Sequence, residues 1–137
     1  MKNIVMAYDT SEQAKKAFDF AVEMAQKYGA QLTVLSVVRP PEPAESVETA
    51  AMLEEASHIY AADFAKLKKK TAPLKVKAKF EVAIGHPAEK IIQRANELKA
   101  DAIVMGHRGK SLVERWLLGS VSKRVISYAH CTVIVVR

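Results

Sequence analysis

The sequence predicts an α/β fold, a three-layer sandwich around a five-stranded parallel sheet. Apolar runs of strand length alternate along the chain with segments whose apolar residues recur at helical spacing. The chain has 137 residues, and neither an internal repeat nor a low-complexity segment divides it. We therefore expect a single domain over residues 1–137, large enough to bury its own core.

The first strand and helix are predicted at the N-terminus. Residues 2–8 are mostly apolar and of strand length, and the segment 11–28 repeats small and apolar residues along one helix face. Thr10 with Gln13 has the spacing of a capping box, which predicts where this helix begins. Gly29 follows the last periodic residue, where a glycine commonly ends a helix.

Three further strands and two helices are predicted in the middle of the chain. Residues 31–38 form the second strand, and three prolines after it predict a stiff loop before a long helix over about 44–70. The alternating segment 74–84 predicts the third strand, and Pro87 suits the first position of the next helix. The apolar run 101–105 predicts a fourth strand that is buried on both faces.

The last helix and strand complete the predicted sheet. An amphipathic segment opens at Ser120, with one apolar face formed by Val121, Val125, Ile126 and Ala129. The strand from Thr132 to Val136 is unbroken and lacks proline and charge, and we expect it at a sheet edge. Because an open edge of this kind favours pairing with a copy of itself, we expect a homodimer through this strand rather than a covered monomer edge.

Right-handed crossovers predict the strand order 3-2-1-4-5 for the sheet. In that order a ligand cleft opens between the carboxyl ends of strands one and four. Asp9 follows the first strand and Gly106 follows the fourth, so the two residues are predicted to meet at this cleft. Asp9 could be part of a plain strand-to-helix turn, or its carboxylate could bind a ribose hydroxyl or a metal ion carried by phosphates.

Three of the five glycines lie in one window between the fourth strand and the last helix: Gly106, Gly109 and Gly119. The amides at Gly109, Ser120 and Val121 could hold phosphate oxygens together with the Ser120 hydroxyl, because a helix N-terminus attracts anions. The window lacks the glycine spacing of a Walker loop, and no dinucleotide fingerprint follows the first strand. The alternative is a structural loop in which Ser120 is an ordinary helix cap.

The formal net charge of +6 is concentrated in one tract, since seven lysines and no acid lie between Lys66 and Lys79. A tract of this density could bind nucleic acid. In its second half, however, Lys75 and Lys77 alternate with apolar residues, as on the solvated face of a strand. We therefore favour a solvated strand face and do not expect nucleic acid as a partner.

No catalytic set or membrane segment is apparent in the sequence. The four histidines have neither metal-ligand spacing nor a neighbouring nucleophile, and we expect Cys131 to be a small core residue rather than a nucleophile. A single cysteine fits a reducing cytoplasm, and there is no apolar run of about 18 residues that could span a membrane. These features favour a cytoplasmic binding protein over an enzyme.

The motif Gly106-x2-Gly109-x9-Gly119-Ser120 resembles the nucleotide-binding signature of the ATP-binding branch of the universal stress protein (UspA) family. The end of the first strand, Asp9-Thr10-Ser11, and the last strand, from Cys131 to Arg137, are similar to the same family. The resemblance implies a Rossmann-like, adenine nucleotide alpha hydrolase-like fold that dimerises through the last strand. It also implies ATP as the ligand, with Mg²⁺ or Mn²⁺ as a companion.

The resemblance further implies which residues form the nucleotide site. Asp9 would lie near the ribose and adenine, the backbone of Val37 would meet the adenine edge, and Gly106 would take the ribose side. The phosphates would lie against Gly109, Gly119, Ser120 and Val121, with Ser122 nearby. The full expected set is Ala7, Asp9, Val37, Met105, Gly106, Gly109, Gly119, Ser120, Val121 and Ser122.

Two departures from the family's pattern accompany the resemblance. Thr132 stands where the family usually has a proline after cysteine, which adds an amide near the expected dimer edge. Tyr8 and Thr10 flank Asp9 where the family often has a small residue and a glycine. Tyr8 would narrow the adenine pocket or select a different nucleotide.

Three functions are compatible with the sequence. The first is a homodimeric ATP-binding stress or signalling module, in which the nucleotide alters the loop 106–119 and with it the surface for a regulatory protein. The second is a slow ATPase or phosphotransferase that uses the same pocket, although no general base is evident beyond Asp9. The third is a nucleic-acid-binding protein that uses the lysine tract. We expect the first.

Overall fold

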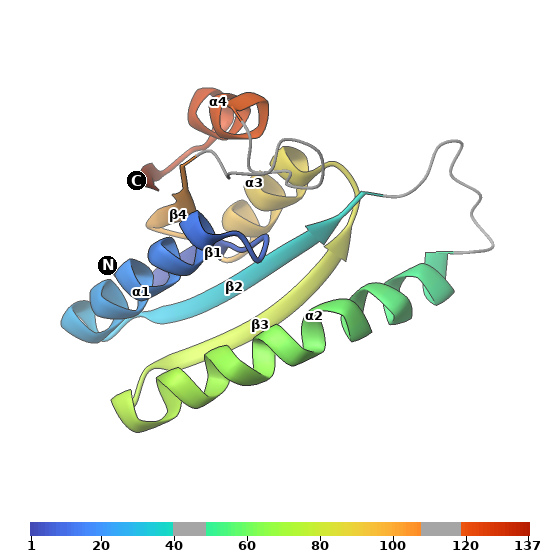
Figure 1. The fold of residues 1–137 in the computed structure, drawn as a ribbon. Helices are drawn as coiled ribbons and strands as arrows, with labels where there is room; N and C mark the ends of the chain where they lie inside the picture. The colour runs from blue at the N-terminus through green and yellow to red at the C-terminus, as the bar shows by residue number, and fades with distance from the viewer. Residues whose placement is uncertain (40–48, 108–118) are drawn as a thin grey trace.

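Five parallel strands form one sheet in the order β3-β2-β1-β4-β5, which confirms the predicted order (Figure 1). The computed structural model describes residues 1–39, 49–107 and 119–137. The strands are β1 (Asn3–Ala7), β2 (Gln31–Val38), β3 (Lys77–Ile84), β4 (Ala102–Gly106) and β5 (Thr132–Val136). The helices are α1 (Glu12–Tyr28), α2 (Thr49–Thr71), α3 (Pro87–Glu97) and α4 (Gly119–Tyr128), with a 3₁₀ turn at Ala72–Leu74.

The two faces of the sheet carry different helices. On β3, the Phe80 ring packs 5.3 Å from the Phe64 ring of α2, measured between ring centroids. The next residue, Glu81, instead receives two hydrogen bonds of 2.7 Å from Arg94 of α3. Successive side chains of a strand point to opposite faces, so α2 and α3 cover opposite faces of the sheet.

The remaining helices, α1 and α4, belong to these two layers. An ion pair of 3.2 Å between Lys70 and Asp19 links α2 to α1. A second ion pair, 3.5 Å between Arg124 and Glu89, links α4 to α3. The helices α1 and α2 thus lie on one face and α3 and α4 on the other, which is the predicted three-layer arrangement.

The centre of the sheet is the apolar core. Every residue of β4 is buried, which confirms a strand covered on both faces. In α1 the buried side is made of small and apolar residues, namely Ala14, Ala17, Phe18, Ala21, Val22 and Ala25. Among the helices of the described ranges, none has the length and apolar character needed to cross a bilayer.

The start of α1 differs from the prediction, because Ser11 is the N-cap and Thr10 with Gln13 forms no capping box. The Ser11 backbone is extended (φ −67°, ψ 161°) and its hydroxyl accepts a 3.0 Å hydrogen bond from the Ala14 amide. Thr10 has φ 68°, in the left-handed region, so it belongs to the preceding turn. The predicted end of the helix is confirmed, since Gly29 has φ 63°.

Three strand boundaries also differ by a few residues. The first strand is shorter than the predicted 2–8, although the Tyr8 amide still donates to the Leu35 carbonyl over 2.9 Å. The third strand begins at Lys77 rather than at 74, because a 3₁₀ turn and a left-handed Lys75 (φ 57°) precede it. The fourth lies one residue later than predicted, and the Asp101 carboxylate accepts the amides of Lys2 and Asn3 instead.

Two further predictions concern the bounds of α2 and the buried face of α4. Of the long helix predicted over 44–70, the structure places Thr49–Thr71 in α2, and residues 44–48 lie outside the described part of the chain. On α4, Val121 and Val125 are buried as predicted, whereas Ile126 is 56% exposed. The prediction for Ile126 was therefore wrong: it lies a further 100° around the helix from Val125, beyond the buried side.

Gly106 is the position where the backbone leaves no room for a side chain. A Cβ atom placed there would lie 2.7 Å from the Gln13 carbonyl carbon, 2.8 Å from its oxygen and 3.0 Å from the Ala14 nitrogen. These are backbone atoms of the first turn of α1, so no side chain can rotate to relieve the contact. The space in the Cβ direction of Gly106 is therefore occupied by α1.

We predict that Gly106→Ala destabilises the fold by about 1–3 kcal/mol, the usual range for overpacking, because α1 must shift to accept the methyl group. Urea unfolding of the two proteins would measure the difference. The matched control is Gly29→Asn, since a Cβ at Gly29 meets nothing within 4 Å and asparagine tolerates its left-handed backbone. Equal stabilities of Gly106→Ala and the parent protein would contradict the close contact.

Candidate functional site

The candidate site lies where the strand connections diverge, at the carboxyl ends of β1 and β4. The two strands pair directly, with Met6 opposite Val104, while β2 and β5 lie on their outer sides. The chain therefore leaves β1 and β4 in opposite directions. We call the space at this divergence the crevice, because parallel sheets typically bind their ligands at such a point. Asp9 follows β1 and Gly106 ends β4, so the fold brings these two predicted residues to the same edge.

Asp9 is held by the cap of α1. Its side chain is only 3% exposed, and its Oδ1 atom accepts a 3.0 Å hydrogen bond from the Ser11 amide and a second one from the Ser11 hydroxyl. The same hydroxyl accepts the amide of Ala14. The Asp9 carboxylate is therefore positioned by the hydrogen bonds that begin α1. Ser11 was not predicted as a site residue, although the Asp-x-Ser spacing at a strand-to-helix turn is a usable signal.

The backbone of Val37 faces the space beyond the end of β1. The β1–β2 ladder closes at Ala7 opposite Leu35, and the Tyr8 amide still donates to the Leu35 carbonyl. Backbone groups two residues apart on a strand point the same way, so the N–H and C=O of Val37 also point toward β1. Past Tyr8 the chain turns away to Asp9 and α1, and these groups face the crevice. The Val37 side chain is itself buried.

The side chain of Tyr8 does not point into the crevice. Its ring is 1% exposed and lies 6.5 Å from the Phe64 ring, and its hydroxyl donates a 3.0 Å hydrogen bond to Asp63 of α2. The backbone carbonyl of Tyr8 accepts a 2.8 Å hydrogen bond from the buried Ser36 hydroxyl. Tyr8 therefore joins β1 to α2 within the core.

The other predicted site residues fall into three groups. The side chains of Ala7, Met105 and Val121 are buried, so only their backbone can face a ligand. At the start of α4, Gly119 is the first helical residue, Ser120 is exposed and Ser122 is half-buried. Gly109 lies outside the described residues.

Gln13 is a polar residue of this edge that the sequence indicated only as a helix cap. It lies in the first turn of α1, and its backbone carbonyl is the closest neighbour of Gly106. Its Oε1 atom is buried and has no hydrogen-bond partner among the residues that the structure describes. A buried acceptor of this kind suits a hydrogen-bond donor such as a ribose hydroxyl.

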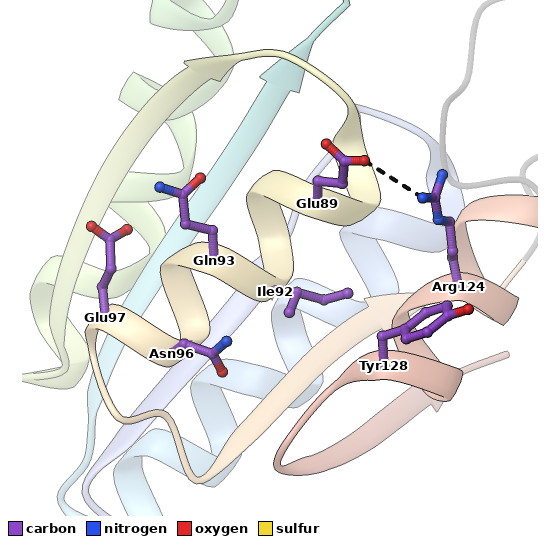
Figure 2. A pocket seen from close by; sticks show the side chains of 7 residues that line it. All are labelled: Glu89, Ile92, Gln93, Asn96, Glu97, Arg124 and Tyr128. Carbon is purple, nitrogen blue, oxygen red and sulfur yellow. Dashed lines mark hydrogen bonds and ion pairs between the residues drawn. The ribbon is translucent and has the colours of Figure 1, made fainter.

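A hollow of about 480 Å³ lies elsewhere, between α3 and α4 (Figure 2). Figure 2 shows Ile92 and the Tyr128 ring along it and the Glu89–Arg124 ion pair at one end. None of the predicted site residues lines this hollow. It lies between the two helices that cover one face of the sheet, and we assign it no role.

The lysine tract does not form one surface. Lys68 of α2 lies 5.6 Å from the centroid of the Phe80 ring, on the α2 side of β3. Lys77 and Lys79 share their side of the strand with Glu81, which faces α3. Lys77 and Lys79 are exposed and alternate with half-buried neighbours along this edge strand, as the solvated-face interpretation predicts.

The described residues supply neither a three-ligand metal centre nor an activated thiol. Within residues 1–39, 49–107 and 119–137, no group of three His, Cys, Asp or Glu side chains could hold a metal ion. Cys131 lies half-buried against the core, and burial raises the pKa of its thiol. This thiol is thus disfavoured as a nucleophile, in agreement with its predicted role as a small core residue.

Comparison with known proteins gives a consistent family. The universal stress protein family model matches residues 1–137. A universal stress protein of Thermus aquaticus is 37% identical, and the match covers 99% of this chain and 98% of that protein. The solved structure of a universal stress protein from Lactobacillus plantarum superposes with a TM-score of 0.78 at 28% identity, over 99% of this chain and 97% of the other.

More distant relatives of the same fold were solved with nucleotides. One universal stress protein in complex with cAMP has a TM-score of 0.76 at 22% identity, over 99% of this chain and 97% of the other. Others hold dAMP, in a protein of Archaeoglobus fulgidus, and AMP, in one of Arabidopsis thaliana. The sheet order, the arrangement at the ends of β1 and β4 and these matches lead to one conclusion: the chain belongs to the universal stress protein family.

Proposed function

We propose that the protein is a cytoplasmic, homodimeric ATP-binding module whose nucleotide occupancy controls binding of a regulatory protein partner. The observation that carries the proposal is that Asp9 and the Val37 backbone meet at the carboxyl edge of the sheet, the edge at which the connection from β4 leads to α4. Nucleotide-bound relatives of the same fold support an adenine nucleotide as the ligand. The loop that follows Gly106 would transmit the change, although residues 108–118 lie outside the described part of the chain.

The adenine would be recognised by backbone groups. An adjacent N–H and C=O pair matches the acceptor and donor on the Watson–Crick edge of adenine, and the Val37 backbone presents such a pair toward the crevice. The buried Asp9 carboxylate and the Gln13 Oε1 atom supply acceptors for the ribose hydroxyls. The residues therefore fit an adenine nucleoside.

The phosphates would lie at the N-terminus of α4. Gly119 and Ser120 open this helix, whose first amides have no intrahelical acceptor and whose dipole favours an anion. A Mg²⁺ or Mn²⁺ ion would be held mainly by the phosphates themselves, with the nearby hydroxyls as additional ligands. When bound, the metal would neutralise phosphate charge.

Binding is favoured over catalysis by the way Asp9 is held. Its Oδ1 atom already accepts two hydrogen bonds from Ser11, so this oxygen is engaged in the cap of α1 rather than directed at a water molecule. Slow ATP hydrolysis at the same pocket is the second candidate. Asp9→Ala would abolish ADP production under that alternative, and a flat time course in the parent protein would exclude it.

Dimerisation through β5 is supported by the surface beside that strand. β5 is an outer strand of the sheet. On α4, Arg124 and Tyr128 face α3 (Figure 2). Val121 and Val125 are buried in the core. By helical spacing Ile126 lies on the remaining flank, away from α3, and since α4 packs on β5 we infer that this flank is directed toward the open edge of the sheet. An exposed isoleucine next to an open strand edge suits an isologous interface.

We predict that ATP with Mg²⁺ raises the unfolding temperature of the protein. Ligand at about a hundred times its dissociation constant should stabilise the fold by ~2.7 kcal/mol, a shift on the order of ten degrees for a chain of this size. The double variant Gly109→Val, Gly119→Val should lose this shift, because side chains would displace the phosphates. Differential scanning fluorimetry would measure both.

GTP is the control for recognition of the base, since its Watson–Crick edge places a donor where adenine has an acceptor. A smaller shift with GTP than with ATP is expected if the Val37 backbone contacts the base. No shift of the parent protein with any adenine nucleotide would contradict the proposed function.

We predict that Ile126→Glu converts the dimer to a monomer, because it places a charge beside the pairing strands. Sedimentation equilibrium would measure the mass of each protein. Tyr128→Glu is the matched control: Tyr128 is 65% exposed but lies on the opposite flank of α4, so this variant should remain a dimer. A monomeric parent protein, or a dimeric Ile126→Glu variant, would count against the β5 interface.

A further inference from the structure

One flank of α2 follows α1 and then the end of β1. Near the C-terminus of α2, Lys70 pairs with Asp19 of α1 over 3.2 Å. Two turns earlier, Asp63 accepts the hydroxyl hydrogen of Tyr8, which directly follows β1. The flank that carries these contacts therefore approaches the carboxyl edge of the sheet toward the N-terminus of α2 (Figure 1).

Ile59 lies on this flank, one turn beyond Asp63. Residues four apart lie on the same side of a helix, about 6 Å from each other along it. Ile59 is 64% exposed, whereas its neighbours Ala56 and Tyr60 are turned into the core. A large aliphatic side chain is thus left uncovered at the edge where Tyr8 leads into Asp9.

The packing of α2 on β3 places Ile59 level with Val37. Phe80 of β3 contacts Phe64 and lies under Lys68. The α2 residues midway between Phe64 and Lys68 are therefore level with Phe80. A helix rises about 1.5 Å per residue and a strand about 3.3 Å, so Ile59 lies about three strand residues further along. That position is Ala83, whose partner on β2 is Val37.

The distance between α2 and β1 at this level is set by Tyr8 and Asp63. The Tyr8 ring is buried against Phe64, and its hydroxyl donates to Asp63 over 3.0 Å. Burial, and after it the neighbouring Asp63, raises the pKa of Tyr8, so the hydroxyl stays protonated and remains a donor at neutral pH. Tyr8 thus holds α2 at a defined place beside the crevice.

We propose that Ile59 covers the face of the adenine ring whose edge meets the Val37 backbone, and that Tyr8 with Asp63 positions this wall. The inference rests on the proposed function, because it assigns a residue to the same nucleotide site. A purine has apolar faces, and aliphatic side chains commonly cover such faces in ligand pockets. The exposed side chain of Ile59 is then one wall of a base-binding site.

The test compares nucleotide affinities by isothermal titration calorimetry. Ile59→Ser should weaken AMP and ATP by about tenfold, the scale expected when an aliphatic contact with the base is lost. The affinity for inorganic tripolyphosphate, which has no base, should not change, and Ile59→Leu should bind as the parent protein does. Tyr28→Ser is the matched control, since Tyr28 is 59% exposed at the C-terminus of α1, at the opposite edge of the sheet.

Tyr8→Phe tests the positioning role, because it removes only the hydrogen bond to Asp63. Its affinity for AMP should fall while its affinity for tripolyphosphate stays unchanged. Unchanged AMP affinity of Ile59→Ser in a parent protein that binds AMP would overturn this inference and leave the proposed function intact. An equal loss of AMP and tripolyphosphate affinity would also overturn it. A parent protein that binds no adenine nucleotide would overturn both.

Discussion

The contact between Gly106 and the first turn of α1 is the constraint on which the candidate site depends. Because no Cβ atom separates them, the end of β4 lies directly against the backbone of Gln13 and Ala14. The loops that leave β1 and β4 therefore start from one place, although they are far apart in sequence. The same turn begins at Ser11, whose hydroxyl holds the Asp9 carboxylate and caps the Ala14 amide. The start of α1, the Asp9 carboxylate and the end of β4 therefore form one structural unit.

The groups of this unit are held in place by hydrogen bonds and backbone packing. The acceptors at the edge are the buried Asp9 carboxylate, which Ser11 at the start of α1 holds by two hydrogen bonds, and the buried amide oxygen of Gln13 in the first turn of α1. A site that is ordered before the ligand arrives loses little entropy on binding. The backbone pair of Val37 is equally fixed, since β2 continues along β3 past the point where β1 ends.

The sequence predicts the fold better than it predicts local contacts. The strand order, both ends of β2 and β5 and the stop of α1 at Gly29 follow from periodicity and turn residues. The cap of α1 does not, because Thr10 and Ser11 are both good caps, and the left-handed backbone of Thr10 decides between them. Likewise, the exposure of Ile126 could not be predicted from the sequence, because it depends on which flank of α4 packs against α3. For the site, the positions of Asp9 and Gly106 could be predicted from topology, whereas the packing role of Gly106 required the neighbouring helix.

Tyr8 departs from the family pattern, and its structural role depends on tertiary contacts that the sequence does not show. In the sequence, a large residue before Asp9 suggests a narrower pocket. In the structure its ring fills the space between β1 and α2, and its hydroxyl reaches Asp63. A smaller residue there would leave a void that α2 could close only by moving toward the sheet. The tyrosine therefore sets how far α2 stands from β1. Its influence on nucleotide choice would act through the position of a helix rather than through contact with the ligand.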